Sequence, residues 1–334
     1  MIGRIIKIHS DIYYVETQIG LVEAKLKTVL KKQKEEVLTG DYVELESIQE
    51  NSKQAFIDSV VNRKNFILRP KVANVSQVII VSALKEPDLD FEQLNRYISH
   101  CEYYKINPVL CFNKEDINDD SALKNIINEV YEKLGYKIVY TSALKKTGIE
   151  ELKPILKDNT SILCGSSGAG KSSLINALLN DSRQRTLPVS NKSKKGVHTT
   201  RHCELIEFDK STFIVDTPGF SHLRFDFLLP SEISALFIEF KEHDFNCKYS
   251  NCLHIGEAGC SAAEIVSKMH PLRYESYKKF VDEANEYKKE ISKKSIKDET
   301  SKKFNQNRIM TKISSKKIEL SRKTANQKFY KDEM

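Results

Sequence analysis

The stretch Gly165–Ser172, Gly-Ser-Ser-Gly-Ala-Gly-Lys-Ser, constrains this 334-residue chain more than any other. It fits the pattern G-x-x-x-x-G-K-[ST], in which glycines let backbone N–H groups surround phosphate oxygens. Residues 161–164 before it predict a strand. Residues 173–179 after it predict a helix, whose N-terminus adds a positive dipole end. A glycine-rich turn that binds nothing would not explain these flanks, so a nucleotide site is predicted.

Each part of this phosphate-binding loop has an expected role. Lys171 should reach the β- and γ-phosphates, and the hydroxyl of Ser172 should bind Mg²⁺. The residues of the loop that we expect to contact the nucleotide are Gly165, Ser166, Ser167, Gly168, Ala169, Gly170, Lys171, Ser172 and Ser173.

A second motif, Asn113-Lys114-Glu115-Asp116, has the pattern N-K-x-D at the end of a predicted buried strand. The carboxylate of Asp116 can accept hydrogen bonds from N1–H and the N2 amino group of guanine. Adenine offers neither donor, and an unmet buried carboxylate costs about 1–3 kcal/mol or more. We expect Lys114 to pack over the base, and backbone N–H groups of Ser142 and Ala143 to bind the guanine oxygen. The predicted nucleotide is therefore GTP.

A third motif, D-x-x-G at residues 216–219, follows another apolar run. We expect Asp216 to hold Mg²⁺ through water and the N–H of Gly219 to contact the γ-phosphate. The polar, lysine-rich stretch 183–197 lacks periodicity and leads to Thr199 and Thr200. Either threonine can complete the metal shell, and we assign Thr200 to Mg²⁺ together with the P-loop serine. These segments are the predicted switches of a GTPase.

The group that orients the attacking water departs from the small-GTPase pattern. Phe220 follows D-x-x-G where a glutamine would stand, and an apolar side chain cannot orient water. A neutral imidazole can, so we predict this role for His198, with His202 as a weaker candidate and an ordinary exposed loop histidine as the alternative. Lys171 and Thr200 complete the predicted catalytic set. Intrinsic turnover should be slow and stimulated by a partner.

The order of these motifs is unusual. In an ordinary small GTPase the P-loop comes first and the base-reading motifs come last, whereas here N-K-x-D and Ser142-Ala143 precede the P-loop and D-x-x-G comes last. Strands that alternate with helices predict a doubly wound parallel sheet. We therefore predict a circularly permuted G domain, in which D-x-x-G runs directly into the C-terminal part and hydrolysis could move that part.

The first 65 residues predict a different structure, a small β-barrel of the OB type. Short alternating runs lie at 3–8, 12–17, 20–24, 42–45 and 55–61, separated by turn residues. Such barrels commonly bind single-stranded nucleic acid, although a fold alone does not prove function. Tyr13, Tyr14 and Tyr42 could stack on bases, but half-buried strand aromatics are the favoured interpretation of any one of them.

Three cysteines and a histidine lie within 14 positions: Cys247, Cys252, His254 and Cys260. A Cys₃His set is a closed structural zinc site, and binding worth roughly 10–16 kcal/mol can fold a segment with little core. The alternative is three buried cysteines and a chance histidine, but the polar residues and glycines around them favour a knuckle with one zinc. The remaining cysteines lie singly in apolar segments and are predicted core thiols: Cys101, Cys111, Cys164 and Cys203.

The charge is concentrated in the C-terminal tail. The net charge is +7, but residues 285–334 contain 15 Lys and Arg against 7 Asp and Glu, so the rest is nearly neutral. We predict a helical start and then a partly disordered tail, which either adds phosphate contacts or is merely solvated. No run approaches 18 apolar residues and residues 1–7 lack a signal-peptide core, so a cytoplasmic protein is expected.

Together these features resemble the RsgA (YjeQ) family of GTPases that depend on the small ribosomal subunit. The resemblance covers about residues 1–285. Besides the nucleotide motifs and the zinc set, it rests on Gly40–Val43, Arg63–Asn65, Arg69-Pro70, Ala73–Val75, Gly196–Thr200 and Arg273–Tyr277. It implies a late assembly factor that binds the subunit and its rRNA, hydrolyses GTP with stimulation by the subunit, uses Mg²⁺ and one zinc, and is a monomer.

The predicted domains are the OB barrel at 1–65, the permuted G domain at 66–225, the zinc domain at 226–285 and the basic tail at 286–334. Asn62 and Val197 depart from residues usual in the family, which puts local contacts in doubt. Two other functions stay open from the sequence: a GTPase with a different target, and an RNA-binding module that uses the nucleotide only to lock a conformation. Phe220 keeps the second open, while Lys171 and Asp216 argue against it.

Overall fold

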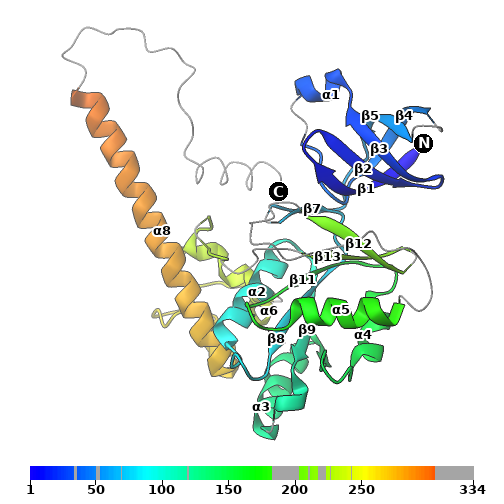
Figure 1. Cartoon of the computed structure of the whole chain (residues 1–334). Coiled ribbons are helices and arrows are strands. Elements are labelled where there is room, and N and C mark those ends of the chain that lie inside the picture. The colour runs from blue at the N-terminus through cyan, green and yellow to red at the C-terminus, as the bar shows by residue number, and fades with distance from the viewer. Residues whose placement is uncertain are drawn as a thin grey trace. The chain divides into compact units, whose positions relative to one another are not determined.

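The structure is a computed structural model that describes residues 1–33, 36–49, 53–68, 70–118, 120–182, 203–209, 211–216, 223–225, 227–241 and 243–304. These residues fall into two compact units, which divide after residue 222 (Figure 1). The first unit contains a small barrel and a larger sheet, and the second contains the cysteine cluster and a long helix.

Five strands form the barrel: β1 Ile2–His9, β2 Ile12–Thr17, β3 Gly20–Leu26, β4 Tyr42–Gln49 and β5 Gln54–Val60. Their order is β1-β2-β3-β5-β4, and β4 also pairs with β1, so the sheet closes on itself. Alternate apolar side chains, among them Ile5, Val15 and Ile57, fill the core. The OB-type barrel is confirmed. Helix α1, Thr28–Gln33, was not predicted, because six residues show no periodicity.

The three barrel tyrosines differ in exposure. Tyr13 and Tyr14 in β2 are half-buried, and Tyr13 packs against the barrel core. Tyr42 in β4 is 40% exposed, and the guanidinium carbon of Arg4 lies 5.2 Å from its ring centroid. Tyr13 and Tyr14 therefore fit the interpretation as strand aromatics, and Tyr42 is the most exposed of the three.

Buried polar contacts hold the connector between the barrel and the larger sheet. Arg63 donates to both carboxylate oxygens of Asp41, at 2.7 and 2.8 Å, and Asp41 is fully buried. The side chain of Asn65 donates to the carbonyl of Val75 at 2.8 Å and accepts from its N–H at 2.9 Å. The connector also forms the hairpin of β6, Phe66–Leu68, and β7, Lys71–Ala73. Several residues that carry the family resemblance thus stabilise this junction.

The larger sheet has six strands: β8 Gln77–Ala83, β9 Asn107–Asn113, β10 Lys137–Tyr140, β11 Thr160–Cys164, β12 Glu204–Asp209 and β13 Thr212–Asp216. Their spatial order is β10-β9-β8-β11-β13-β12, parallel throughout except for β12. Strand β11, which leads into the P-loop, lies inside the sheet although three strands of the sheet precede it in the chain. This order is that of the predicted permuted G domain.

The helices of this domain are α2 Phe91–Tyr103, α3 Ser121–Ile127, α4 Ile149–Leu156 and α5 Lys171–Ser182, with a π-helical turn at Asn128–Glu132. Asp90 caps α2 by accepting from the N–H of Gln93 at 3.0 Å. Helices α4 and α5 pack on the sheet face formed by Ile79, Leu163 and Ile214. The predicted alternation of strands and helices is confirmed.

Three of the four predicted core thiols are buried: Cys101, Cys111 and Cys164. Burial raises the pKa of Cys111 to about 11, as expected for an unreactive core cysteine. The prediction is wrong for Cys203, which is only half-buried. It directly precedes β12, which lies between β13 and β1 of the barrel, so Cys203 stands just before a strand and not within one.

The second unit is helical: 3₁₀ turns Pro230–Glu232 and Ser234–Leu236, then α6 Ile238–Lys241, α7 Ala263–Lys268 and α8 Pro271–Phe304. Its core contains Phe225, Phe237 and Phe280. Arg273 is fully buried and donates to both oxygens of Glu239, at 2.7 and 2.8 Å. Helix α8 extends into the predicted tail, and residues 305–334 lie outside the described residues. No helix in the described ranges is long and apolar enough to cross a membrane.

Candidate nucleotide and metal sites

The predicted nucleotide motifs meet at one edge of the G-domain sheet. Strands β8, β9, β10, β11 and β13 are parallel, so their carboxyl ends lie at the same edge. Asn113 ends β9, residues 141–143 follow β10, and Gly165 follows β11. Asp216 ends β13, and its backbone pairs with Leu163. This edge is where open α/β sheets bind ligands.

The P-loop approaches its neighbours too closely to accept side chains at two glycines. Gly165 has φ +142°, and a Cβ atom there would lie 1.9 Å from the carbonyl oxygen of Val81. At Gly170, with φ +90°, a Cβ would lie 2.3 Å from Nδ2 of Asn113. Lys171 donates from Nζ to the carbonyls of Gly165 and Ser166, at 2.7 and 2.9 Å. The ammonium group therefore lies within the loop, and Ser172 at the start of α5 is exposed.

Asn113 joins the base-reading motif to the P-loop. Its Nδ2 donates to the carbonyl of Ala169 at 2.9 Å. Its Oδ1 accepts from the N–H of Ala143 at 3.1 Å and from the hydroxyl of Thr141 at 3.2 Å. This one buried side chain thus fixes the P-loop and the loop after β10 relative to each other.

Asp116 is held in place by the Ser142-Ala143 loop. The hydroxyl of Ser142 donates to Oδ1 of Asp116 at 2.5 Å and accepts from the N–H of Lys145 at 3.0 Å. Oδ2 of Asp116 has no hydrogen-bond partner among the described residues, and the side chain is half-buried. A fixed carboxylate with acceptor capacity left over suits the two donors of guanine.

One wall of the site was missed by the sequence analysis. The loop after β8 contributes the carbonyl of Glu86, which accepts a hydrogen bond from Nζ of Lys114. Pro87 of the same loop lies against the P-loop, since a Cβ at Gly168 would be 3.4 Å from its Cδ. No motif marks these residues. Only the sheet order, with β8 between β9 and β11, brings them to the site.

The predicted switch residues lie largely outside the described residues. These are His198, Thr199, Thr200, His202, Gly219 and Phe220. Of the third motif the structure describes the backbone of Asp216, which pairs with Glu204 of β12 as well as with Leu163. The assignments to these side chains stay predictions.

The second unit brings the four predicted zinc ligands together. The Sγ atoms of Cys247, Cys252 and Cys260 and a ring nitrogen of His254 all lie within 4.8 Å of one another. The three sulfurs lie 3.8, 3.7 and 3.4 Å from Nδ1 of His254. A tetrahedral zinc with ordinary bond lengths requires S···N separations of about 3.6 Å. The donor set and its spacing therefore fit zinc.

Contacts around the ligands also suit a metal site. Ser261 donates its N–H to Sγ of Cys247 at 3.4 Å, and its hydroxyl lies 3.2 Å from the same sulfur. These hydrogen bonds lower the pKa of Cys247, which favours the thiolate that a metal needs. Glu257 accepts from the N–H groups of Leu253 and Ile255, at 2.7 and 2.8 Å, and so fixes the turn that carries the histidine.

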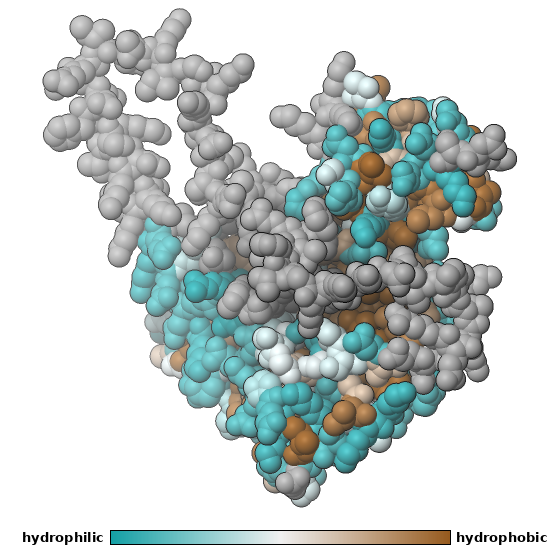
Figure 2. Space-filling model, viewed as in Figure 1, coloured by the Kyte–Doolittle hydropathy of each residue, from teal (hydrophilic) through white to brown (hydrophobic). Residues whose placement is uncertain are grey.

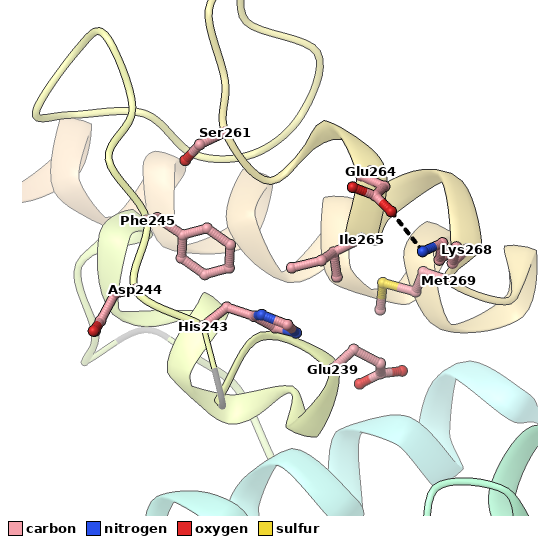
Figure 3. Close-up of a pocket in the computed structure, with 9 residues that line it drawn as sticks. All are labelled: Glu239, His243, Asp244, Phe245, Ser261, Glu264, Ile265, Lys268 and Met269. Carbon is pink, nitrogen blue, oxygen red and sulfur yellow. Dashed lines mark hydrogen bonds and ion pairs between the residues drawn. The ribbon is translucent and has the colours of Figure 1, made fainter.

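The segment around the cysteines has almost no hydrophobic core. Between residues 243 and 262 the one buried hydrophobic side chain in the described chain is Ala262. The ring of Phe245 contacts that of His254, with centroids 4.6 Å apart, but it also faces a cavity of about 400 Å³. Figure 3 shows Phe245, Ile265 and Met269 around this cavity, with Ser261 at its rim. A metal would supply the stability that packing does not provide.

Comparison with protein families identifies the chain. The model of the RsgA GTPase domain matches residues 60–226, and the model of the RsgA N-terminal domain matches residues 2–57. A curated relative from Caldanaerobacter subterraneus is 39% identical over 289 residues, which is 86% of this chain and 97% of the relative. The chain belongs to the RsgA family. Both its motifs and its overall sequence similarity therefore place it in a GTPase family.

Further relatives agree with this placement. The curated protein from Clostridium botulinum is 39% identical over 292 residues and is matched over 99% of its length. It and the Caldanaerobacter protein are both named small ribosomal subunit biogenesis GTPase RsgA. A model described as a 50S ribosome-binding GTPase also matches residues 160–298. That match starts at β11, so it leaves out the base-reading motifs that the permutation has placed before the P-loop.

Two solved structures share the fold. YjeQ from Thermotoga maritima superposes with a TM-score of 0.72 at 34% identity, covering 85% of this chain and 98% of that one. YloQ, described as a circularly permuted GTPase, gives 0.70 at 29% identity, covering 85% and 95%. The permuted RsgA architecture inferred from motif order is thus confirmed by strand order and by solved relatives.

Proposed function

We propose that this chain is a GTP hydrolase that acts as a late assembly or maturation factor of the small ribosomal subunit. The observation that carries the proposal is the meeting of guanine-reading and phosphate-binding motifs at one sheet edge, in a chain matched along most of its length by small-subunit biogenesis GTPases. The 50S-related match covers a shorter stretch and carries less weight. The proposal places the protein in the cytoplasm as a monomer.

We propose that the three motifs and the loop after β10 supply the contacts to GTP. Asn113, Lys114, Glu115, Asp116, Ser142 and Ala143 bind the base; 165–173 bind the phosphates; Asp216 and Gly219 respond to Mg²⁺ and the γ-phosphate. Ser172 and Thr200 are the proposed Mg²⁺ ligands, and His198, Lys171 and Thr200 the proposed catalytic groups. Cys247, Cys252, His254 and Cys260 are proposed to hold one structural zinc, and the domains are those predicted above.

We propose that the barrel binds rRNA through side-chain contacts more than through net charge. Residues 1–65 contain ten Lys and Arg and ten Asp and Glu, so the barrel lacks an electrostatic excess. Figure 2 shows apolar residues at its surface among hydrophilic ones. The exposed large hydrophobic residues of the barrel are Met1, Ile2, Ile19, Leu21, Val29, Tyr42, Phe56 and Val61. Of these, the aromatic rings of Tyr42 and Phe56 can stack on bases, whereas the basic tail would supply phosphate contacts.

Multiple-turnover GTP hydrolysis with and without purified small subunits tests the function. We expect slow intrinsic turnover and a stimulation of about 10³-fold or more, because a partner must complete a site that lacks the usual glutamine. Large subunits at equal concentration are the control. Equal stimulation by both subunits would indicate another target, and no turnover under any condition would favour the module that only binds nucleotide and RNA.

Replacing His198 with alanine tests the proposed water-orienting group. We expect subunit-stimulated kcat to fall by about 10²–10⁴-fold, as for loss of a general base, while the Kd for GTP stays the same. His202→Ala is the comparison, because His202 is the weaker candidate for the same role, and a larger loss in His202→Ala than in His198→Ala would reverse the assignment. Unchanged stimulated turnover in His198→Ala would exclude this histidine from the mechanism.

A further inference from the structure

A buried arginine lies where the barrel meets the G-domain sheet. Arg4 belongs to β1 of the barrel and is 7% exposed. Its Nη2 donates to the hydroxyl of Thr160 at 2.7 Å, and its guanidinium carbon lies 4.6 Å from the ring centroid of Phe213. On the barrel side it lies over the ring of Tyr42. A single charged side chain therefore contacts both domains of the first unit.

Besides the carbonyl of Asn74, to which Nη2 donates at 3.5 Å, Arg4 contacts two G-domain residues near the start of the strands that lead to the phosphates. Thr160 is the first residue of β11, which ends at the P-loop. Phe213 is the second residue of β13, which ends at Asp216. The two strands pair directly, with Thr160 opposite Phe213 and Leu163 opposite Asp216. If β11 shifted against β13 at the nucleotide edge, the distance between the hydroxyl of Thr160 and the ring of Phe213 would therefore change.

The same side of the barrel contacts the other strand of the G-domain hairpin. Lys7 of β1 pairs with Glu204 of β12, and their side chains form an ion pair at 3.0 Å. The hydroxyl of Thr39 donates to the carbonyl of Cys203 at 3.3 Å. Residues 203 and 204 directly follow the stretch that carries the predicted switch threonines. The barrel is thus joined to β11, β12 and β13, and Arg4 is the buried centre of this junction.

Burying the charge of Arg4 costs desolvation free energy, which a contact with only a structural role would not need. Burial lowers the pKa of its guanidinium, and the charge of Glu16, which lies opposite Arg4 in the β1–β2 pair, offsets part of this shift without a close ion pair. Its Nε has no hydrogen-bond partner in the described part of the chain. Apolar residues of similar volume often replace buried charges without loss of stability. Burial and the neighbouring Glu207 of β12 raise the pKa of Glu16, whereas the charge of Arg4 lowers it.

We propose that Arg4 is a positioning residue for the GTPase site, which couples the relative placement of β11 and β13 to the barrel. Its hydrogen bond to Thr160 and its contact with Phe213 hold β11 and β13 in one position relative to each other. Glu16, which lies opposite Arg4 in the β1–β2 pair, offers the Nε–H of the arginine an acceptor when those contacts change. Because binding free energies are reciprocal, a barrel that responds to the nucleotide must also shift nucleotide affinity when the barrel binds its own ligand.

Full-length variants test this coupling without ribosomes. Arg4→Met removes the charge at similar volume, Thr160→Val removes the acceptor, and Arg4→Lys keeps the charge. Arg63→Met is the matched control, since Arg63 is another partly buried arginine of the first unit, which pairs with Asp41 and lies over the ring of Phe66. Two quantities are measured: the ratio of Kd values for GDP and a non-hydrolysable GTP analogue with Mg²⁺, and amide hydrogen exchange of residues 1–65 in both nucleotide states.

In the wild-type protein we expect barrel peptides to exchange differently in the two states. Arg4→Met and Thr160→Val should abolish this difference and change the Kd ratio about 5-fold or more, the lower end of ordinary coupling. Arg4→Lys should restore part of it, and Arg63→Met should retain it despite any lower melting temperature. The proposal would be overturned if barrel peptides of the wild type exchanged equally in the two nucleotide states. It would also be overturned if Thr160→Val and a folded Arg4 variant both kept the wild-type difference in exchange. The inference rests on the proposed GTP site, but it survives a failure of the proposed ribosomal role.

Discussion

Replacing Cys260 with serine is expected to abolish zinc binding and to unfold the segment between residues 243 and 262. Structural zinc contributes roughly 10–16 kcal/mol at neutral pH, and a ligand set with a missing thiolate loses most of it. The described segment buries no hydrophobic side chain except Ala262, so packing cannot compensate. Metal analysis should fall from one zinc per chain to nearly none, and hydrogen exchange of the segment should rise to the rate of an unstructured chain.

The control for this experiment is Cys203→Ser, which replaces a half-buried cysteine in the first unit. That variant should retain its zinc and its exchange pattern. Protein purified without chelator that contains no zinc, or a Cys260→Ser variant with unchanged exchange, would contradict the assignment.

The sequence alone predicted best those features whose residues lie close together along the chain. Alternation predicted the five barrel strands, and the P-loop pattern predicted its own strand and helix, because both signals extend over a few neighbouring residues. The zinc set was predictable for the same reason, since all four ligands lie within 14 positions. In each case the information needed lies in a single short segment.

Contacts between distant segments could not be predicted in this way. The carbonyl of Glu86 at Lys114 and the contact of Pro87 with Gly168 depend on the order of β9, β8 and β11 in the sheet. Arg4 gave no signal at all, because its partner Thr160 lies 156 residues away. A lone arginine in an alternating strand is predicted to be an exposed barrel residue. Its burial becomes visible only when the barrel is placed against β11 and β13.

Replacing Asp116 with asparagine is expected to reverse the base preference of the site from guanine toward xanthine. The asparagine amide can still accept from N1–H, but it meets the N2 amino group of guanine with a donor. Xanthine has a carbonyl at that position, which the amide can bond. Loss of a hydrogen-bonded pair in a half-buried site costs about 1–3 kcal/mol, so the Kd for GDP should rise about 5- to 150-fold. Xanthosine diphosphate should bind more tightly to the variant than to the wild type.

Competition of guanosine, xanthosine and adenosine diphosphates against a fluorescent GDP measures this change. Asp120→Asn is the matched control. Asp120 is an exposed carboxylate four residues away that caps α3 by accepting from the N–H groups of Ala122 and Leu123, which asparagine also does. The hydroxyl of Ser142 can donate to the new amide oxygen as it does to Oδ1 of Asp116, so Asp116→Asn should fold normally. Equal losses for guanosine and xanthosine nucleotides would mean that Asp116 supports the loop rather than reading the base, and guanine selection would then have to come from the backbone of Ser142 and Ala143.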